Sequence, residues 1–301
     1  MKNIAILLLI FSSSALYAQQ DPLYAQYINN PLLVNPGYTG FHKSLNISGG
    51  YRQQWSGYDG PKTINFSADI ALRDNRMGTG ILLVSDQTGA STTTDLLFTY
   101  AYKIPLNHNT QLSFGMQAGA INSSIDNGKL NVFDTNDPLF QGKENSWVPN
   151  AGVGVILNNH RYLIGLAVPR MLKATERLRN TEYILYSRHY YFMASYLYPI
   201  SENLTFKPFV LMRYIKSAPL STDIHASVII NNKFQGGVFT RNFETYGMSL
   251  NLLMNSRYRL GYVIEIPVTT SIESKFLTHE VMLGIRLNTL SNHDLLSAIG
   301  F

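Results

Sequence analysis

The chain has 301 residues, 24 of them Lys or Arg and 19 Asp or Glu, and it contains no cysteine. That length allows two ordinary soluble domains or one large closed sheet, and the absence of cysteine excludes a disulfide scaffold and a thiolate zinc site. Charged residues are only 14% of the chain, the net charge is +5, and the basic residues are scattered singly along the sequence. Nucleic acid is therefore not an expected partner, because it calls for a concentrated basic face.

Residues 1–18 have the features of a cleaved export signal. Lys2 supplies the positive start, residues 4–11 an apolar core, and residues 12–18 a small-residue end with cleavage before Gln19. A buried N-terminal helix is the alternative interpretation. After residue 18 no apolar run approaches the ~20 residues of a spanning helix. Such a chain is expected to be periplasmic, secreted or an outer-membrane barrel.

Residues 19–43 predict an irregular N-terminal segment. The dipeptides Asn30-Pro31 and Asn35-Pro36 favour turns or extended backbone, because proline disfavours the helical conformation in the residue before it. The apolar run at 32–34 between them indicates partial burial. The segment is either a terminal arm packed on the main domain or a plug in the periplasmic mouth of a barrel.

Between residues 44 and 288 the sequence predicts about fourteen short strands, followed by a tail at 289–301. The pattern is clearest at 246–266, where apolar and aromatic residues alternate with small or charged ones on both sides of the hairpin signal Asn255-Ser256. The predicted strands are residues 44–55, 63–72, 78–85, 94–104, 111–121, 148–157, 162–168, 188–198, 204–215, 222–230, 234–241, 246–254, 258–266 and 278–287.

The connections between these strands alternate in length. Short turns are expected at 74–76, 105–109, 158–159, 201–203, 231–232 and 255–256. The intervening connections, which include every long one, are 56–62, 86–93, an irregular insertion at 122–146, then 169–187, 216–221, 242–244 and 267–277. Short periplasmic turns and longer outer loops are typical of a bacterial outer-membrane barrel. The sequence therefore favours an all-β fold, a single transmembrane antiparallel β-barrel, over a soluble sandwich, with both termini periplasmic.

Aromatic residues near the predicted strand ends are consistent with this fold, because tyrosine collects at membrane interfaces. Tyrosine is also simply a good strand residue, which is the alternative. The tyrosines concerned are Tyr102, Tyr162, Tyr198, Tyr214, Tyr246 and Tyr258.

The polar face of the strands carries charges of both signs, and in a barrel this face lines the lumen. Opposite charges on one face can pair, which lowers the cost of removing them from water. The sequence thus predicts a structural charge network, with a solute-selective pore lining as the alternative. The predicted lumen residues are Asp69, Lys207, Arg213, Asp223, His225, Arg259, Glu265, Glu280 and Arg286.

Catalytic and metal-binding motifs are weak, so no enzyme and no cofactor are expected. His279-Glu280 lacks the second histidine of a zinc helix and lies in a predicted strand. Asp223, His225 and Ser227 share one strand face, but residues two apart on a face stand roughly 6.5–7 Å from each other, too far for direct proton relay.

Two stretches near the N-terminus, DPLYAQYINNPLLVNPGYTG and YRQQWSGYDGPKT, resemble the start of the PorP/SprF family of Bacteroidota outer-membrane proteins. Later matching stretches are 152–172, 188–214 and 278–287, whereas GYVIE at 261–265 departs from the family's usual Gly-Tyr-Ser-Tyr-Asp. The residues that carry the N-terminal motif are Asp21, Pro22, Gln26, Tyr27, Asn30, Pro31, Asn35, Pro36, Gly40, Tyr51, Arg52, Gln54 and Trp55.

The resemblance implies an outer-membrane barrel, in contact with membrane lipids, that is associated with the type IX secretion system. It implies as partners a secreted or surface-anchored client, such as a gliding adhesin, other secretion components and a peptidoglycan-binding lipoprotein. An outer-membrane channel or porin for small solutes is the alternative function.

Overall fold

The fold is known from a computed structural model, which describes residues 24–42, 44–57, 59–72, 75–129, 142–172, 174–178, 181–186, 188–216, 218–255, 257–268 and 276–287. The expected signal peptide at 1–18, the motif residues Asp21 and Pro22, and the tail at 289–301 lie outside these ranges. Within them, no helix has the length and apolar composition needed to cross a membrane.

Three short 3₁₀ helices precede the strands: η1 (Gln26–Ile28), η2 (Pro31–Leu33) and η3 (Pro36–Tyr38). Each of the last two begins with its proline, whose missing N–H and fixed φ suit the first helical position. The strands are β1 (Leu45–Gln53), β2 (Lys62–Leu72), β3 (Met77–Thr88), β4 (Ser91–Pro105), β5 (Gln111–Asp126), β6 (Lys143–Asn158), β7 (Tyr162–Val168), β8 (Ala174–Leu178), β9 (Thr181–Tyr186), β10 (His189–Tyr196), β11 (Tyr198–Ser201), β12 (Leu204–Ile215), β13 (Ser221–Ile230), β14 (Phe234–Arg241), β15 (Thr245–Met254), β16 (Tyr258–Pro267) and β17 (Thr278–Leu287); η4 (Asn127–Lys129) follows β5.

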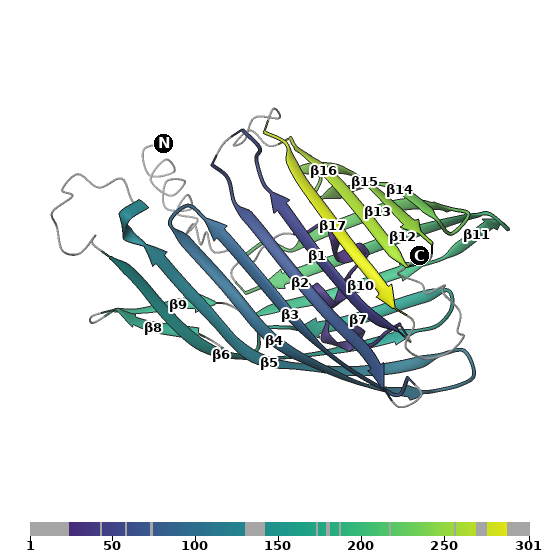
Figure 1. Ribbon diagram of the computed structural model, residues 1–301, viewed down its shortest axis with the longest axis horizontal. Helices are drawn as coiled ribbons and strands as arrows, with labels where there is room; N and C mark the ends of the chain where they lie inside the picture. Colours follow the sequence, from purple (N-terminus) through teal and green to yellow (C-terminus); the bar gives the residue numbers. More distant parts are fainter. Residues whose placement is uncertain are drawn as a thin grey trace, which may run out of the picture.

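Fourteen antiparallel strands close into a barrel, which confirms the predicted fold class (Figure 1). Each strand pairs with the next along the chain, β10 pairs with both β7 and β12, and β1 pairs with β17 to complete the ring. The seam between β1 and β17 runs from Leu45 opposite Leu287 to Gln53 opposite His279. The short β11 is an extra strand that pairs with β12 beyond the end of β10.

Connections of two kinds lie at the two ends of the barrel. We call the end with the connections 73–76, 106–110, 159–161, 202–203, 231–233 and 255–257 the turn rim. We call the opposite end, with the connections 54–61, 89–90, 127–142, 169–188, 216–220, 242–244 and 268–277, the loop rim. The segregation of short and long connections follows the sequence prediction.

Two of the expected loops are wrong in extent. The loop expected at 86–93 is a continuation of β3 and β4, which pair up to Thr88 opposite Ser91 and leave only residues 89–90 as a turn. The insertion expected at 122–146 is partly strand, since β5 and β6 pair up to Asp126 opposite Lys143. These extensions are rich in Ser, Thr and Asn, and they lack the apolar alternation by which a strand is recognised.

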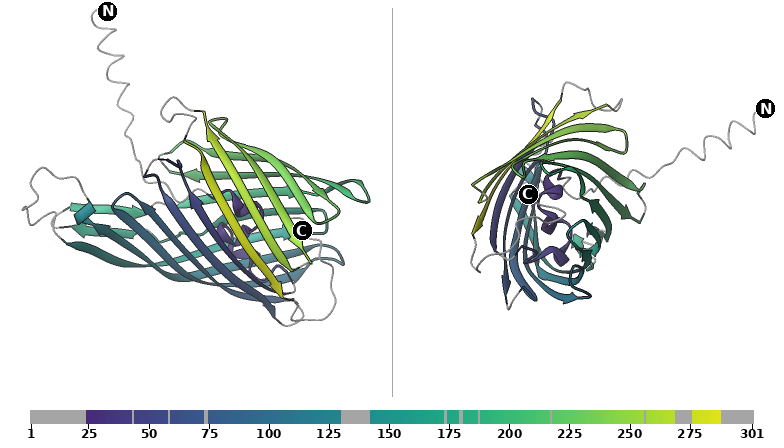
Figure 2. Two further views of the ribbon diagram at one scale, coloured as in Figure 1. Left: turned by 45° about the horizontal axis from the view of Figure 1, so that its top comes forward. Right: turned by 90° about the vertical axis from the view of Figure 1, so that its right-hand side faces the viewer.

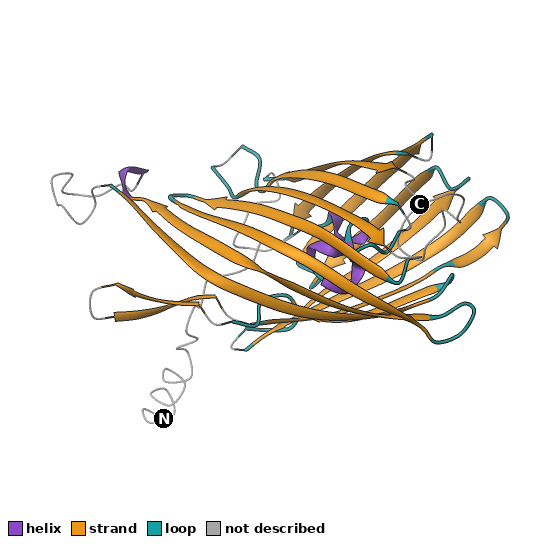
Figure 3. Cartoon of the chain, turned by 60° about the horizontal axis from the view of Figure 1, so that its bottom comes forward, coloured by secondary structure: helices purple, strands orange, loops and turns teal. Residues whose placement is uncertain are grey.

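The connection after β7 contains a further element. Strands β8 and β9 pair with each other in a separate two-stranded sheet and do not join the barrel wall (Figure 3). This hairpin lies at the loop rim, between the end of β7 and the start of β10.

Alternate side chains of each strand face outward and inward, and the outward set is apolar. In β15, Met248 and Leu250 are 59% and 64% exposed, whereas the alternate Ser249 and Asn251 are buried. This is the opposite of a soluble protein's arrangement and is typical of a wall that faces lipid. Five of the six tyrosines expected near the interfaces are exposed at or near strand ends; Tyr162 is half-buried.

Residues 24–42 lie inside the barrel, where they fill the lumen (Figure 2). Ile28, Leu32 and Val34 are buried in a cluster with wall residues such as Ile156 and Phe209. The main hydrophobic core of the protein therefore lies between this segment and the wall. Burying these apolar groups stabilises the seated segment.

The wall approaches η3 closely at glycines. A Cβ on Gly115 of β5 would lie 2.2 Å from the Gly37 nitrogen, and one on Gly154 of β6 would lie 2.1 Å from the Asn35 side-chain oxygen. Any other residue at these positions would overlap the segment. The small residues of β5 and β6 thus form the bed in which η3 lies.

Candidate functional site

The interior of the barrel, with the segment threaded through it, gathers most of the buried polar groups. At the loop-rim end the central group is Arg52 of β1. Its guanidinium binds Glu265 of β16 through two bonds of 3.0 and 2.7 Å, and it also reaches Glu280 of β17 at 3.3 Å. All three side chains are at most 3% exposed. A bidentate pair of this kind is geometrically specific as well as strong.

Glu280 connects this charged group to the segment. Its carboxylate accepts hydrogen bonds from the backbone nitrogens of Ala25 at 2.8 Å and Gln26 at 3.2 Å. These two N–H groups lie at the start of η1, where no intrahelical acceptor is available to them. The wall charge therefore fixes the beginning of the threaded segment.

A second cluster continues around the same end. Arg241 of β14 donates to Asp223 of β13 at 2.9–3.1 Å and to the carbonyl of Tyr24 at 3.1 Å. The Tyr27 hydroxyl donates to Asp223 at 2.5 Å and lies 2.8 Å from His225 Nε2. Burial, and next the Asp223 carboxylate, raises the pKa of Tyr27 well above its usual range.

The two clusters are joined. Arg241 lies 3.6 Å from Glu265, so two arginines and three carboxylates from β1, β13, β14, β16 and β17 form one network. Paired charges tolerate burial that a single charge would not. The network runs along one arc of the wall, from β1 through β17 and β16 to β14 and β13, and it spans β15 between β16 and β14.

Asparagines hold the middle of the segment. The Asn29 side chain donates to Asn251 of β15 at 2.8 Å, and the Asn30 side chain donates to Ser48 and Ser67, both at 2.9 Å. The Asn35 side chain accepts from Gly37 N at 2.8 Å and donates to the carbonyls of β6 and β7. An amide can both donate and accept, which lets one side chain serve the helix start and the wall.

At the turn-rim end the segment is fixed at Gly40. Its nitrogen donates to Asp69 at 2.8 Å, and its carbonyl accepts from Lys103. Gly40 has a φ of +62°, and a Cβ there would lie 2.6 Å from Gly78 Cα, so only glycine suits the position.

His42 completes this end of the segment. Its Nε2 lies 3.0 Å from both the Tyr38 hydroxyl and the Arg286 guanidinium. Burial, followed by the charges of Arg286, Arg259 and Lys103, lowers the pKa of His42 well below its usual range. A neutral imidazole can accept from Arg286, whereas a protonated one cannot.

These contacts define a direction. Tyr24 and Ala25 lie beside Arg241 and Glu280, at the loop-rim ends of β14 and β17, whereas Gly40 and His42 lie beside the turn rim. Residues 24–42 thus cross the barrel from one rim to the other. The described chain begins at the loop rim and ends, with Leu287, at the turn rim.

Eight of the nine predicted lumen residues are buried and Arg259 is half-buried, but their pairing is unequal. Asp223, Glu265 and Glu280 belong to the joined network, His225 contacts Tyr27, and Asp69, Arg259 and Arg286 act at the segment's middle and turn-rim end. Lys207 lies fully buried on β12. Arg213 has no hydrogen-bond or ion-pair partner among the described residues. Asp223 pairs with Arg241, and both Glu265 and Glu280 pair with Arg52. Arg259 donates to the Asn29 carbonyl at 2.8 Å, and Arg286 donates to the Asn46 side chain at 3.2 Å.

Sequence reasoning missed several charged members of the interior. Arg241 was within a predicted strand, and its register opposite Asp223 would have indicated the pair. Lys103 and the ion pair between Asp95 and Arg170, 2.5 Å long, were also missed. Arg52 was singled out only as part of a family motif, although its alternation with the outward Tyr51 gives its inward direction.

Most of the described motif residues serve the segment or the loop rim. Gln26, Tyr27, Asn30, Pro31, Asn35, Pro36 and Gly40 lie in the segment, and Arg52 pairs with Glu265. Tyr51 faces outward and donates to Gln53 at 2.9 Å. The Gln54 nitrogen donates to Pro61 O at 2.9 Å, and the Trp55 nitrogen donates to Thr278 Oγ1 at 3.3 Å, which shapes the first loop.

The considered triad does not assemble among the described residues. His225 contacts Tyr27, while Ser227 donates to the carbonyl of Lys207 at 3.0 Å and accepts from Gln235 at 3.1 Å. No three His, Asp or Glu side chains in the described ranges are grouped so that they could hold a metal ion.

A closed antiparallel barrel with an apolar outer face and a polar interior defines the class of protein: an outer-membrane β-barrel. Solved outer-membrane barrels have the same fold. A FadL homologue of Pseudomonas aeruginosa has a TM-score of 0.51 at 9% identity, covering 91% of this chain and 96% of that chain. The Ralstonia pickettii toluene transporter TbuX has 0.50 at 9% identity, with 85% and 93% covered. A deltaS2S3 mutant of TodX, a monoaromatic hydrocarbon channel, has 0.52 at 10% identity, with 86% and 94% covered.

The family follows from the sequence match. The model of the type IX secretion system membrane protein PorP/SprF matches residues 16–285, and the chain belongs to this family. Among curated proteins no sequence match was found. The resemblance stated from the N-terminal motif is thereby confirmed.

Proposed function

We propose that this barrel is a non-enzymatic accessory of the type IX secretion system that supports secretion or surface anchoring of a partner protein of the gliding or adhesin type. Membership of the family supports the secretion role. The observation that carries the docking role is the filled lumen, in which residues 24–42 are bound to the wall near both rims. A barrel filled in this way acts through its rims and not through its bore.

In the proposed orientation the loop rim faces outward and the turn rim faces the periplasm, because bacterial barrels have short periplasmic turns and longer outer loops. Leu287 is then periplasmic, whereas Tyr24 lies at the outward rim. Of the two termini that the sequence predicts on the periplasmic side, this proposal retains only the C-terminal one. The client would dock on the loop rim, and a peptidoglycan-binding lipoprotein would meet the turn rim.

The docking role is tested by altering one rim at a time. One variant replaces residues 172–187, which include the β8–β9 hairpin, with a short Gly-Ser linker, and the matched control replaces the turn at 106–110 in the same way. Each is expressed in cells that lack the native barrel. We expect the first to lose secretion or anchoring of the client and the second to keep it. Equal secretion by both, at equal barrel levels in the outer membrane, contradicts the proposal.

A solute channel is the second candidate. It is favoured by the likeness of the fold to barrels that are named as a toluene transporter and a monoaromatic hydrocarbon channel. Conductance across planar lipid bilayers separates the two functions. The docking proposal expects the native barrel to be silent, whereas a large and stable conductance would support the channel.

A further inference from the structure

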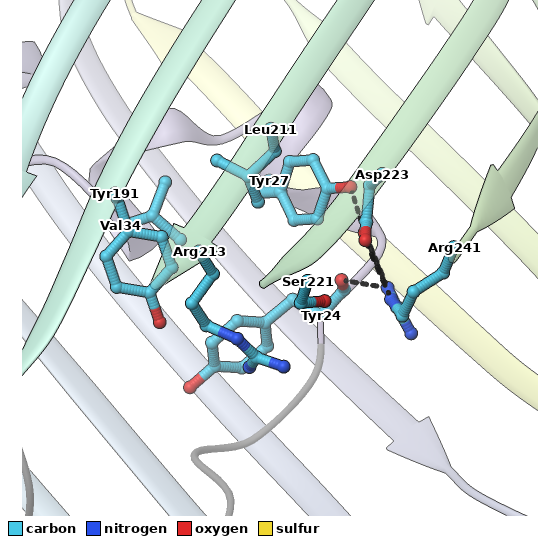
Figure 4. A pocket seen from close by; sticks show the side chains of 9 residues that line it. All are labelled: Tyr24, Tyr27, Val34, Tyr191, Leu211, Arg213, Ser221, Asp223 and Arg241. Atoms are coloured by element: carbon cyan, nitrogen blue, oxygen red, sulfur yellow. Dashed lines mark hydrogen bonds and ion pairs between the residues drawn. The ribbon is translucent and has the colours of Figure 1, made fainter. Parts of the chain in front are cut away.

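Next to the start of the threaded segment lies a small pocket at the loop-rim end of the lumen (Figure 4). Its cavity volume is about 20 Å³, which is room for about one water-sized group. Tyr24 lines it from the segment, Tyr191 from β10, Arg213 from β12, Ser221 and Asp223 from β13, and Arg241 from β14.

The two arginines of this pocket differ in their partners. Arg241 is neutralised by Asp223, with which it makes three contacts of 2.9–3.1 Å. The remaining contact of Asp223 is with the Tyr27 hydroxyl, and no hydrogen bond or ion pair joins Asp223 to Arg213. Arg213 as a whole residue is only 9% exposed, and among the described residues its guanidinium meets no hydrogen-bond acceptor and no carboxylate.

A largely buried arginine without a counter-charge is unfavourable, because it has lost hydration and gained no partner. Arginine presents donors in a planar fork that fits the two oxygens of a carboxylate. The cavity has room for about one water-sized group, so a carboxylate paired with Arg213 would place one oxygen in it and keep the rest of its molecule outside. The hydroxyl of Ser221, on the next strand, lies on the same lining.

We propose that the Arg213 pocket is a binding site for a single carboxylate at the loop rim, and that it receives an acidic group of a polypeptide docked there. The carboxylate enters from the rim and pairs with Arg213, while the rest of the polypeptide stays outside. What supports the binding site itself is the guanidinium of Arg213, which has no partner among the described residues. The choice of a polypeptide as the source rests on the proposed docking function.

The pocket is tested with acetate as the probe, on the complete barrel in nonionic detergent micelles. Melting is followed by circular dichroism as sodium acetate replaces sodium chloride at constant ionic strength. Acetate is expected to raise the melting temperature of the native protein in a saturable way, because a ligand of the folded state stabilises it. Arg213→Gln is expected to abolish this rise, and without acetate to melt no lower than the native protein, since it removes an uncompensated charge.

The matched control is Arg257→Gln, the same change at an exposed position of the turn rim, and it is expected to keep the full response. Arg213→Lys, which keeps the charge but loses the fork, is expected to respond more weakly and serves if Arg213→Gln does not fold. The proposed carboxylate site is overturned if the melting temperature is the same in chloride and in acetate, or if both Arg213 variants respond to acetate as the native protein does.

The source of the carboxylate is tested with two capped peptides, acetyl-Gly-Gly-Glu-amide and its Gln counterpart. A polypeptide site is expected to bind the Glu peptide about tenfold more tightly than acetate, because the chain adds contacts at the rim, and not to bind the Gln peptide. Affinity for the Glu peptide no better than for acetate overturns the polypeptide source. These titrations contain no client, so their outcome is independent of the secretion test above.

Discussion

Arg52 and Glu265 pair along the inner face of the wall from strands that are not neighbours, since β17 lies between β1 and β16. The intervening strand supplies Glu280, which Arg52 also contacts. One guanidinium thus bridges three consecutive strands on both sides of the seam where the sheet closes. The same three strands hold the start of the threaded segment through Glu280.

Removing Arg52 should destabilise the barrel strongly. Arg52→Met leaves Glu265 with only its longer contact to Arg241 and leaves Glu280 without its cation, and an uncompensated buried charge costs about 3–5 kcal/mol. Unfolding in guanidinium, followed by circular dichroism, measures the loss. The double variant Arg52→Met with Glu265→Gln should recover part of it, because it removes the orphaned carboxylate. A loss as small as that of the exposed control Arg257→Met would contradict the role given to Arg52.

The Tyr27 hydroxyl should contribute to the stability of the folded barrel. Tyr27→Phe removes its bonds to Asp223 and His225, which should lower the free energy of unfolding by about 1–3 kcal/mol. Tyr214→Phe, a change on the exposed outer face, is the matched control and should have little effect.

The same residue predicts an alkaline sensitivity. The pKa of Tyr27 is raised in the folded state, so its contribution is complete below about pH 10, where the unfolded tyrosine is neutral, and is lost as the pH rises from there through the folded pKa. Unfolding measured from pH 8 to 11.5 should show a steeper loss for the native protein than for Tyr27→Phe. Parallel curves would exclude this account.

His42 predicts the opposite dependence. Its pKa is lowered in the folded state, so the unfolded chain binds the proton first, and stability should fall as the pH drops below about 6.5. His42→Gln, which still offers an acceptor to Arg286, should flatten the dependence between pH 7.5 and 5. His160→Gln, at an exposed turn-rim position, should leave it unchanged. The comparison needs only melting temperatures at the two pH values.

Gly115 should control whether the segment is seated. Gly115→Val would overlap the backbone of Pro36 and Gly37, and overpacking of this kind costs about 1–3 kcal/mol. We expect it to displace η3 and to raise the conductance in planar bilayers above that of the native barrel. Gly236→Ala, whose Cβ would meet nothing closer than 3.7 Å, should conduct no more than the native barrel. A Gly115→Val barrel with no added conductance and with native stability would contradict the close packing of η3 against β5.

Much of this fold could be predicted because lipid imposes a period of two on each strand. The alternation at Met248, Ser249 and Leu250 gives the direction of every side chain in β15, and the same parity gave the inward direction of Glu265 and Glu280. Near the loop-rim ends of β3 at Thr88 and of β5 at Asp126, the wall extends beyond the apolar belt. Both faces of the strands are polar there, and the period of two disappears. There the strand ends were placed too early.

The partners inside the lumen could not be predicted in the same way. Local alternation says that Arg52 points inward, but its pairing with Glu265 depends on how β1 meets β17, and so on closure of the whole ring. The path of residues 24–42 likewise follows from contacts with strands more than 200 positions away. Proline and asparagine indicated an irregular segment and contained no information about which rim it starts from.

The threaded segment has a consequence for how the barrel is made. It is synthesised before every strand, yet the carboxylate that holds its start belongs to β17, the last strand of the ring. The closed wall and the seated segment therefore stabilise each other, because Glu280 of β17 contacts both Ala25 and Arg52 of β1. A variant that cannot seat the segment would therefore also lose contacts of β17, the strand that joins the two ends of the sheet.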